Sequence, residues 1–441
     1  MESKAQEKKI MVKVNTKKKV IERRLKKEGL LDIVNMVGTT SDRVGEDTYL
    51  VGDVVKNVLT NQKDNALTFV SSDPKKVMDA IADDIEEVTT ERPKIFNIDS
   101  FTKKMVVGGT GIEVSDPIKE IWSLSSLEPK KEKGNFLDDA LGRTFTIDAL
   151  ALGTQAKNFL DVVDYTGKGV SDLGRKILRT PLDADEMMRN DPAIMLEVAR
   201  LSACDNFKIA EDVRDAIKDR VNHIDRLSVD VIREEMDQGI LCGKYIATMD
   251  KLNLMEEVLP EIGDMKRHKS GSGIVEFNHT IQVSKGLPKE RIIRWVGLLH
   301  DLGIITREEK HAKEGKEIAL SVLERFKFPE EDKCHIAEMV GRHKALKPYV
   351  YRNVPEEEVK GFILDNEPFL DEIFTFAVAD KWGHWNKKKQ TKKIKLIKKF
   401  KKQVNRNIKE MCEEDILPPT SRLCGNDELP EDFSYCSLID D

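Results

Sequence analysis

Apolar positions follow two different periods along the chain, and both occur in its first third. Between residues 46 and 115, short apolar runs bounded by glycine or charged residues predict strands, and longer stretches with apolar positions every three or four residues predict helices. The predicted strands span 49–51, 66–70, 104–107 and 111–114, and the predicted helices span 54–59 and 74–85. Gly108-Gly109 predicts a hairpin turn. This alternation is typical of an α/β domain.

From about residue 151 onward the helical period dominates. Apolar residues recur every three or four positions within 193–201, 213–217 and 229–236, which predicts amphipathic helices that bury one face. A further apolar helical run begins at Arg294, and His300 and Asp301 lie at its C-terminal end. We therefore expect residues 151 to about 265 to be mainly helical.

Composition places the chain among globular proteins. Of its 441 residues, 39% are hydrophobic and 34% are charged, and the length predicts about three domains. The sequence contains no apolar run near the roughly 18 residues that a bilayer-crossing helix needs. The charged N-terminus also leads into no signal-type apolar core. We expect a cytoplasmic protein with no membrane partner.

The net charge of -6 conceals a basic start and an acidic end. Eleven lysines and arginines occur in the first 27 residues, and Ile21, Leu25 and Leu30 offer apolar anchorage within the basic segment at 1–45. We expect this segment to be a solvated, partly frayed extension, with an ordered nucleic-acid contact as the alternative.

A second basic segment, at 387–402, contains ten lysines. Ile394, Ile397 and Phe400 form a narrow apolar ridge on this otherwise cationic predicted helix. Lysines that neutralise phosphates give salt-sensitive, sequence-independent affinity, so RNA is the favoured partner. The alternatives are a solvated helix docked by its ridge and an anionic membrane surface. The expected RNA-binding residues are Lys387, Lys388, Lys389, Lys392, Lys393, Lys395, Lys398 and Lys399.

Histidine is concentrated in one quarter of the chain, because seven of the eight histidines lie between residues 268 and 384. Within this window the adjacent pair His300-Asp301 offers an imidazole and a carboxylate to one divalent metal. A single pair of this kind is more often a capping or surface pair. The preceding His279 and the later Asp380, at the end of an apolar run, strengthen the metal-binding interpretation.

The order His279, His300-Asp301, Asp380 resembles the HD phosphohydrolase family over about residues 265–385. The resemblance implies that these four residues hold one metal, and that His300 and Asp301 are at the catalytic centre. His311 and His343 fit the ligands of a second metal in a two-metal subgroup. The implied cofactor is Mn, Fe, Zn, Mg or Ni, which would activate water to attack a phosphate ester.

One position departs from that pattern. The HD family often places lysine directly after His-Asp-x-Gly, and this chain has Ile304 there. Arg307, Lys310 or Arg342 are the expected replacements as phosphate contacts.

A second resemblance covers about residues 46–385. Several segments look like bacterial-type tRNA nucleotidyltransferases (CCA-adding enzymes) and poly(A) polymerases, a family that often carries an HD domain. These segments are Leu50-Val51-Gly52-Asp53, Lys63-Asp64-Asn65-Ala66, Gly142-Arg143-Thr144-Phe145-Thr146-Ile147-Asp148 and Arg189-Asn190-Asp191-Pro192. The resemblance implies RNA, in particular tRNA, as partner. The nucleotide-binding residues that it carries over are Gly52, Asp64, Arg143 and Asp191.

The departures from this second pattern occur at the positions that the resemblance assigns to phosphate, metal and base binding. Asp53 replaces a phosphate-cradling glycine and Ala66 replaces a metal-binding aspartate. Asp148 stands for an asparagine and Ile194 for a base-reading arginine. Because two-metal phosphoryl transfer needs carboxylates on both ions, we expect nucleotidyl transfer to be impaired.

Three functions remain open from the sequence. The favoured one is an HD-type phosphohydrolase or phosphodiesterase on a degenerate nucleotidyltransferase scaffold, acting on a nucleotide or RNA-end phosphate. The second is an active nucleotidyltransferase that uses Asp64 with Glu113, Asp53 or Asp148. Instead of binding a metal, Glu113 could simply be a solvent-facing residue on a half-buried strand. The third is a non-catalytic RNA-binding or partner-binding subunit.

The expected fold is α+β, with a nucleotidyltransferase-like α/β palm followed by an all-α neck and an all-α HD domain. The predicted segments are a basic extension at 1–45, the palm at 46–150, the neck at 151–265, the HD domain at 266–385, and a basic helix with an acidic tail at 386–441.

Overall fold

The computed structural model describes residues 12–14, 18–60, 67–123, 126–267, 276–305, 311–383, 387–414, 416–417, 421 and 423, with the backbone alone at 12–14, 305, 311 and 387–390. Contacts divide the chain into two units, the first comprising Met1–Ile194 with Asn206–Arg220 and the second Met195–Asp205 with Val221–Asp441. Strands and helices alternate in the first unit, whereas the described part of the second consists of helices. The predicted α+β class is confirmed, and the predicted segment borders stay predictions. Within the range predicted as a helical neck, residues 162–164, 177–178 and 208–209 form strands, and the first of these pairs into the main sheet.

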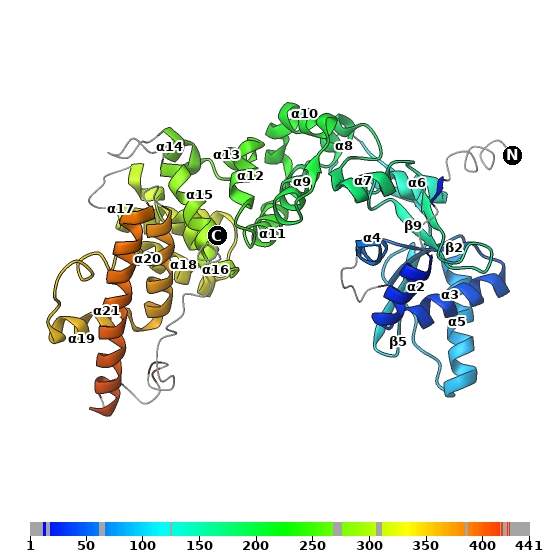
Figure 1. The fold of residues 1–441 in the computed structure, drawn as a ribbon. Coiled ribbons are helices and arrows are strands. Elements are labelled where there is room, and N and C mark those ends of the chain that lie inside the picture. The colour runs from blue at the N-terminus through cyan, green and yellow to red at the C-terminus, as the bar shows by residue number, and fades with distance from the viewer. Residues whose placement is uncertain are drawn as a thin grey trace. The chain divides into compact units, whose positions relative to one another are not determined.

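An eight-stranded sheet forms the centre of the first unit (Figure 1). From one edge to the other its strands are β1 (Val12–Val14), β10 (Val162–Asp164), β9 (Leu150–Gly153), β2 (Thr48–Val51), β3 (Leu67–Ser71), β6 (Thr110–Ser115), β5 (Thr102–Val107) and β4 (Phe96–Asn97). Strand β2 is antiparallel to both β9 and β3, and β3 is parallel to β6. A parallel pair requires a crossover connection between its two strands.

Helix α5 (Pro74–Thr89) lies in that crossover and packs against β3, β5 and β6. Asp73 begins it by accepting a hydrogen bond from the backbone N–H of Lys76, with Pro74 in the first turn. The helix ends at Thr90, whose backbone N–H reaches the carbonyl of Glu86. The predicted helix at 74–85 is confirmed and is one turn longer.

The basic N-terminal segment contributes two helices to the same unit, α2 (Lys18–Lys27) and α3 (Leu31–Val44). Ile21, Leu25 and Leu30 are buried, while most lysines of α2 are exposed. The expectation of a solvated, partly frayed extension is therefore wrong for residues 18–45. These residues form packed helices because burying their apolar face stabilises the helices even though the opposite face is highly charged.

Strand β2 leads through Gly52 into α4 (Asp53–Thr60), as the apolar pattern predicted. Gly52 has a φ of 82°, a left-handed conformation that favours glycine. This turn places Asp53 at the first residue of α4 and Lys56 one turn later on the same face.

Shorter elements complete the first unit. They are the ribbon of β7 (Ile118–Ile121) and β8 (Lys130–Lys133), the parallel pair of β11 (Ile177–Leu178) and β12 (Lys208–Ile209), and the helices α6 (Phe136–Leu141), α7 (Gly169–Arg175), α8 (Ala184–Asn190) and α10 (Glu211–Arg220). Helix α9 (Ala193–Cys204) contributes residues to both units.

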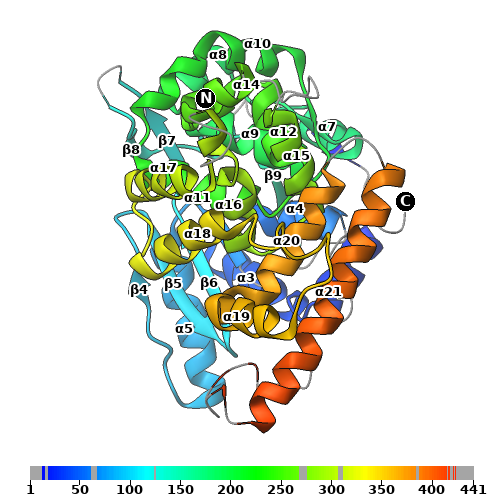
Figure 2. The same ribbon diagram turned by 90° about the vertical axis from the view of Figure 1, so that its left-hand side faces the viewer.

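The second unit is a set of packed helices. They are η1 (Val221–Arg226), α11 (Val229–Gly239), α12 (Tyr245–Lys251), α13 (Leu254–Val258), α14 (Glu261–Arg267), α15 (Glu276–Gly286), α16 (Arg291–Leu299), η2 (Leu302–Ile305), α17 (His311–Arg325), α18 (Glu330–Arg342), α19 (Glu356–Asn366), η3 (Glu367–Phe369), α20 (Leu370–Trp382) and α21 (Lys387–Glu413). Helix α20 is the central one, since it contacts α15, α16, α18 and α21 (Figure 2). No helix in the described ranges combines the length and apolar character that crossing a membrane requires.

Buried Arg294 fixes the connection between α15 and α16. Its guanidinium donates hydrogen bonds to the backbone carbonyls of Ser284, Leu287 and Pro288, the last at 2.6 Å. One side chain of α16 thereby satisfies one carbonyl in the last turn of α15 and two carbonyls just after it. The two helices consequently hold a fixed relation to each other, which matters because each carries a histidine of the site below.

The predicted apolar ridge of α21 is buried against its neighbours. Ile394, Ile397 and Phe400 are each less than 10% exposed, and the Phe400 ring stacks on that of Tyr349 at 5.6 Å. Of the predicted RNA-binding lysines, Lys393 is half-buried, the side chains of Lys387, Lys388 and Lys389 lie outside the described residues, and Lys392, Lys395, Lys398 and Lys399 are exposed. Docking the ridge thus leaves most of the described lysines facing outward.

Candidate functional site

Four helices of the second unit bring five candidate metal ligands together. His279 lies on α15, His300 and Asp301 follow the end of α16, His343 follows α18, and Asp380 lies near the end of α20. All five residues are buried. Of the metal ligands predicted from the sequence, the sixth, His311, begins α17, but its side chain lies outside the described residues.

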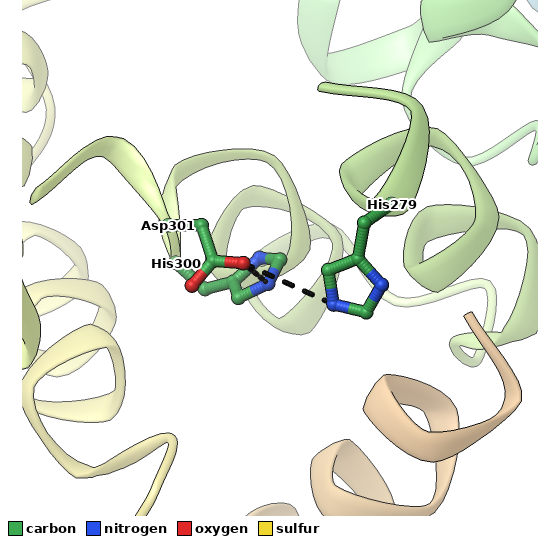
Figure 3. A group of neighbouring side chains, drawn as sticks. All are labelled: His279, His300 and Asp301. Carbon is green, nitrogen blue, oxygen red and sulfur yellow. Dashed lines mark ion pairs between the residues drawn. The ribbon is translucent and has the colours of Figure 1, made fainter. Parts of the chain in front are cut away.

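The ligand atoms converge on Asp301. One donor atom each from His279, His300 and Asp301 lies within 4.8 Å of the others (Figure 3). Asp301 Oδ2 is 2.9 Å from His300 Nε2 and 3.9 Å from His279 Nε2, and Oδ1 is 3.5 Å from His343 Nε2. Asp380 Oδ1 lies 3.0 Å from His279 Nε2. The two oxygens of Asp301 therefore face different histidines, as a carboxylate shared by two ions would.

Backbone carbonyls orient two of these imidazoles. His300 Nδ1 lies 3.0 Å from the Gly297 carbonyl, and His343 Nδ1 lies 2.6 Å from the Val340 carbonyl. Because a carbonyl only accepts, each Nδ1 carries a hydrogen and each Nε2 faces the cluster. In the neutral form of each ring, Nε2 is then the nitrogen that could bind a metal.

The carboxylates are held in their charged forms. Burial acts to raise the pKa of Asp301, but the imidazoles of His300 and His343 bring it well below its usual value. Burial also opposes ionisation of Asp380, and the charges of Lys381 and His279 lower its pKa well below the usual value. Burial would lower the pKa of His279, yet its hydrogen bond with Asp380 raises it.

The residues fit a divalent metal. His300 Nε2 is buried and makes no hydrogen bond of acceptable geometry, although Asp301 lies beside it. A buried acceptor is costly unless it is hydrogen-bonded or coordinates a metal. Imidazole and carboxylate donors suit first-row divalent ions.

Small residues and one aromatic ring shape the walls of the site. A Cβ on Gly383 would lie 2.8 Å from His279 Nδ1, and a Cβ on Gly315 would lie 3.4 Å from the Gly303 backbone nitrogen. The Phe376 ring contacts His300 edge-on at 5.1 Å. Gly315 of the predicted His-x-x-x-Gly pattern therefore lets α17 approach the segment that carries the His-Asp pair.

Three residues were predicted to contact phosphate in place of a lysine at position 304, and the structure describes only one of their side chains. Arg307 and Lys310 lie outside the described residues. The Arg342 guanidinium donates to the Asp365 carbonyl at 2.7 Å and to Asn366 Oδ1 at 2.9 Å, and it stacks on the Phe369 ring. Arg342 is thus engaged within the helical packing.

Sequence reasoning missed two lysines at the site, Lys344 and Lys381. Each directly follows a candidate ligand, His343 or Asp380, and this adjacency was the only signal in the sequence. Lys381 Nζ lies 2.5 Å from Asp380 Oδ2, and burial lowers the pKa of Lys344 against the opposing charges of Asp301 and Asp380.

In the first unit, some of the positions that resemble a nucleotide-binding site lie outside the described residues, and the others form ion pairs or hydrogen bonds. Asp64 and Ala66 lie outside the described residues. Lys56 Nζ lies 2.8 Å from Asp53 Oδ1 and 2.9 Å from Asp148 Oδ1, so one lysine pairs with two of the substituted acids. Burial raises the pKa of Asp148 despite the opposing charge of Lys56.

The other acidic and basic candidates there also have partners. Glu113 pairs with Lys104 at 2.8 Å and is partly exposed. Arg143 pairs with Asp139 at 2.8 Å. Asp191 ends α8, accepts a hydrogen bond from the Ala193 backbone N–H at 3.0 Å, and has its pKa raised by burial.

Comparison with protein families finds three matches in order along the chain. Residues 48–179 match the poly A polymerase head domain, 206–265 match a probable RNA- and SrmB-binding site of polymerase A, and 275–382 match the HD domain. The candidate metal ligands of the second unit lie within the last match.

Individual proteins are similar to parts or most of the chain. A tRNA nucleotidyltransferase of Schizosaccharomyces pombe is 34% identical over 29% of this chain and 25% of its own length. A CCA-adding enzyme of Leuconostoc citreum is 22% identical over 64% of this chain and 68% of its own length. Among solved structures, a Thermotoga maritima CCA-adding enzyme in complex with tRNA superposes with a TM-score of 0.58 at 17% identity, covering 86% of this chain and 84% of that one.

Proposed function

The chain belongs to the bacterial-type tRNA nucleotidyltransferase family, and from that premise we propose that it binds RNA ends and hydrolyses a phosphate ester at its HD domain. The observation that carries this proposal is the convergence of His279, His300, Asp301 and Asp380, with His343 beside them. One similar protein is named a tRNA nucleotidyltransferase, and one solved structure similar to this chain is in complex with tRNA. We propose a tRNA 3′ end as the RNA partner.

His279, His300, Asp301 and Asp380 would hold one divalent metal, and Asp301 Oδ1 with His343 would contribute to a second together with His311. A bound metal would supply water activated for attack on phosphorus. The protein's own groups set the geometry: Gly297 and Val340 carbonyls fix the imidazole tautomers, and Phe376 closes one side of the site. The negative charges of Asp301 and Asp380 would stabilise a cation at this buried site.

Impaired nucleotidyl transfer is the second part of the proposal. Lys56 engages Asp53 and Asp148, and Glu113 is engaged by Lys104, so the acids that would replace a lost metal ligand are paired with lysines. To bind a metal, each would have to exchange its ammonium partner. Losing one metal carboxylate in such a site costs several orders of magnitude in rate, on the order of 4 kcal/mol.

An active CCA-adding enzyme is the alternative, and one observation favours it: the similar proteins above are tRNA nucleotidyltransferases and CCA-adding enzymes. Incubation with tRNA lacking its terminal nucleotides and labelled CTP or ATP tests this point. The proposal expects no incorporation. Incorporation that Asp64→Ala abolishes would establish the alternative.

Metal analysis tests the HD site. Purified protein is expected to contain a divalent metal that His300→Ala loses, because His300 Nε2 is a central donor of the cluster. His335→Ala is the matched control, since His335 lies on α18 and pairs with Glu372 at 2.8 Å instead of joining the cluster. Equal metal content in both variants would contradict the assignment.

Hydrolysis is measured on nucleotides and short RNAs that end in phosphate, with and without His300→Ala. Loss of hydrolysis in this variant and retention in His335→Ala is the expected result. Metal-free protein that still binds tRNA with full affinity would instead indicate a non-catalytic RNA-binding subunit.

A further inference from the structure

A groove lies between α21 and the segment that joins α18 to α19, and we call it the α21 groove. Its volume is about 580 Å³, and its lining consists of residues 349–354 together with Leu396, Lys399, Phe400 and Gln403 of α21. All of these residues belong to the second unit. The five buried candidate metal ligands are not among the lining residues. The α21 groove is therefore a different place from the metal-ligand cluster.

Contacts between its two walls hold the α21 groove in shape. The Tyr349 ring stacks on the Phe400 ring, with the ring centroids 5.6 Å apart and an angle of 10° between the planes. Gln403 Nε2 donates a hydrogen bond to the Val354 carbonyl at 3.0 Å. Arg352 donates to the Pro348 carbonyl at 3.0 Å. A ligand would thus meet walls that are already ordered, which lowers the entropic cost of binding.

Two apolar side chains in the lining remain open to solvent. Tyr351 is 50% exposed and Leu396 is 38% exposed, although their neighbours Val350, Val354 and Phe400 are buried. A single exposed tyrosine is ordinary on a protein surface. Here the tyrosine lies in a groove beside lysines. Single-stranded nucleic acids bind to this combination, because bases stack on aromatic rings and phosphates pair with cations.

The charge of the α21 groove favours an anionic ligand. None of the described residues that line it is acidic, and its two charged residues are Lys399 and Arg352. Arg352 pairs with Glu358, whereas Lys399 is exposed on α21. Lys392 and Lys395 are also exposed and lie about one helical turn before Leu396 and Lys399. A row of lysines therefore continues from the groove along the same face of α21.

We propose that the α21 groove binds an unpaired nucleotide of single-stranded RNA, with its base stacked on Tyr351 and its phosphate on Lys399; this rests on the proposed binding of RNA. A base inside a duplex is already stacked and paired, whereas an unpaired base can turn outward onto an aromatic ring. The lysines along α21 then contact the phosphates of the neighbouring nucleotides.

Binding of RNA to the full-length protein tests the stacking. The probes are a single-stranded RNA of about eight nucleotides and the duplex of the same sequence, followed by fluorescence anisotropy. Tyr351→Ala is expected to weaken binding of the single strand about tenfold and to leave duplex binding unchanged, because only an unpaired base loses its stacking partner. Tyr351→Phe retains the ring and should bind as the wild-type protein does. Phe96→Ala is the matched control, since Phe96 is 52% exposed but lies in the first unit.

Salt dependence separates the two contributions. Lys399→Gln should reduce the slope of log affinity against log salt concentration by about 0.7, the value for one phosphate contact on a single strand. Tyr351→Ala should lower the affinity without changing that slope, because stacking releases no counterion. A 2-aminopurine base in the RNA should be quenched by the wild-type protein and by Tyr351→Phe, and less by Tyr351→Ala. Unchanged single-strand affinity and unchanged quenching in Tyr351→Ala would overturn the proposal.

The outcomes also distinguish this inference from the proposed function. If the wild-type protein and Tyr351→Ala bind tRNA and the single strand equally well, the stacking assignment fails and RNA binding stands. If the wild-type protein binds none of the RNAs, both fail. A changed oligomeric state of Tyr351→Ala in sedimentation, with unchanged RNA affinity, would identify the groove as a contact with a second copy of the chain and would overturn the proposal.

Discussion

Lys56 shows how two acidic substitutions in the first unit depend on a single side chain. Asp53 and Asp148 lie 95 residues apart in the chain, yet both contact the Lys56 ammonium. Asp148 and Lys56 are each less than one fifth exposed, whereas the Asp53 side chain is 72% exposed. Only the pair with Asp148 is buried enough to matter for stability, because exposed pairs contribute little.

Replacing Lys56 with methionine is expected to lower the free energy of unfolding by about 1–3 kcal/mol, since it leaves the buried Asp148 carboxylate without its cation. The double variant Lys56→Met with Asp148→Asn should recover most of that loss. Urea unfolding followed by circular dichroism measures both. Lys76→Met, which breaks a half-exposed pair with Glu46, is the control and should cost no more than about 0.5 kcal/mol. Equal losses of unfolding free energy in Lys56→Met and Lys76→Met would show that burial of the Lys56–Asp148 pair does not increase its contribution to stability.

At the scale of elements, close helix packing brings the candidate metal ligands together. The ligands come from α15, α16, α18 and α20, and glycines stand where these helices approach the ligands. Gly297 on α16 would place a Cβ 2.4 Å from the Leu287 side chain, and Gly383 after α20 would place one 2.8 Å from His279. The site therefore depends on the spacing of helices as much as on its donor atoms.

Gly383→Ala should weaken metal binding about tenfold to a hundredfold although every ligand is still present. The new methyl group would displace the His279 imidazole, and disturbing the groups that orient a ligand typically has an effect of that size. Gly361→Ala in α19 is the control, because nothing lies within 4 Å of its Cβ position. Competition with a metal-sensitive dye measures the affinities. An unchanged affinity in Gly383→Ala would mean that His279 has room to adjust.

At the scale of the whole molecule, the overall charge of -6 says little about where a polyanion binds. Helix α21 buries its ridge and presents Lys392, Lys395, Lys398 and Lys399 to solvent. The basic N-terminal segment instead uses its helices to pack on the sheet unit. Of these two lysine-rich segments, α21 is the one that we propose for RNA.

Changing Lys392, Lys395, Lys398 and Lys399 together to glutamine should weaken tRNA binding and flatten its dependence on salt. Each lysine that contacts a phosphate contributes roughly 0.7–0.9 to the slope of log affinity against log salt concentration. Filter binding at several salt concentrations gives that slope. A variant with Lys75, Lys289, Lys313 and Lys347 changed to glutamine removes the same charge from exposed positions elsewhere. Equal slopes in the two variants would argue against a specific role of α21.

Local patterns predicted most of the elements and a large part of the candidate site. Strand β2, the turn at Gly52, helix α5, the hairpin of β5 and β6, and the ridge of α21 follow from periodicity and turn residues, which act over a few neighbouring positions. The candidate metal ligands were predicted because their order along the chain resembles a known family. The expectation for residues 18–45 failed because charge density was weighed above a short apolar face.

The sequence by itself determined the period of each helix and strand, the positions of the candidate metal ligands and the basic character of α21. Tertiary structure alone decided which of the distant side chains meet: His279 with Asp380, and Lys56 with Asp148. The physical reason is range. Backbone preferences and apolar periods act within a few residues, whereas these contacts join positions tens to a hundred residues apart, and only the packing of whole helices and strands brings them within reach.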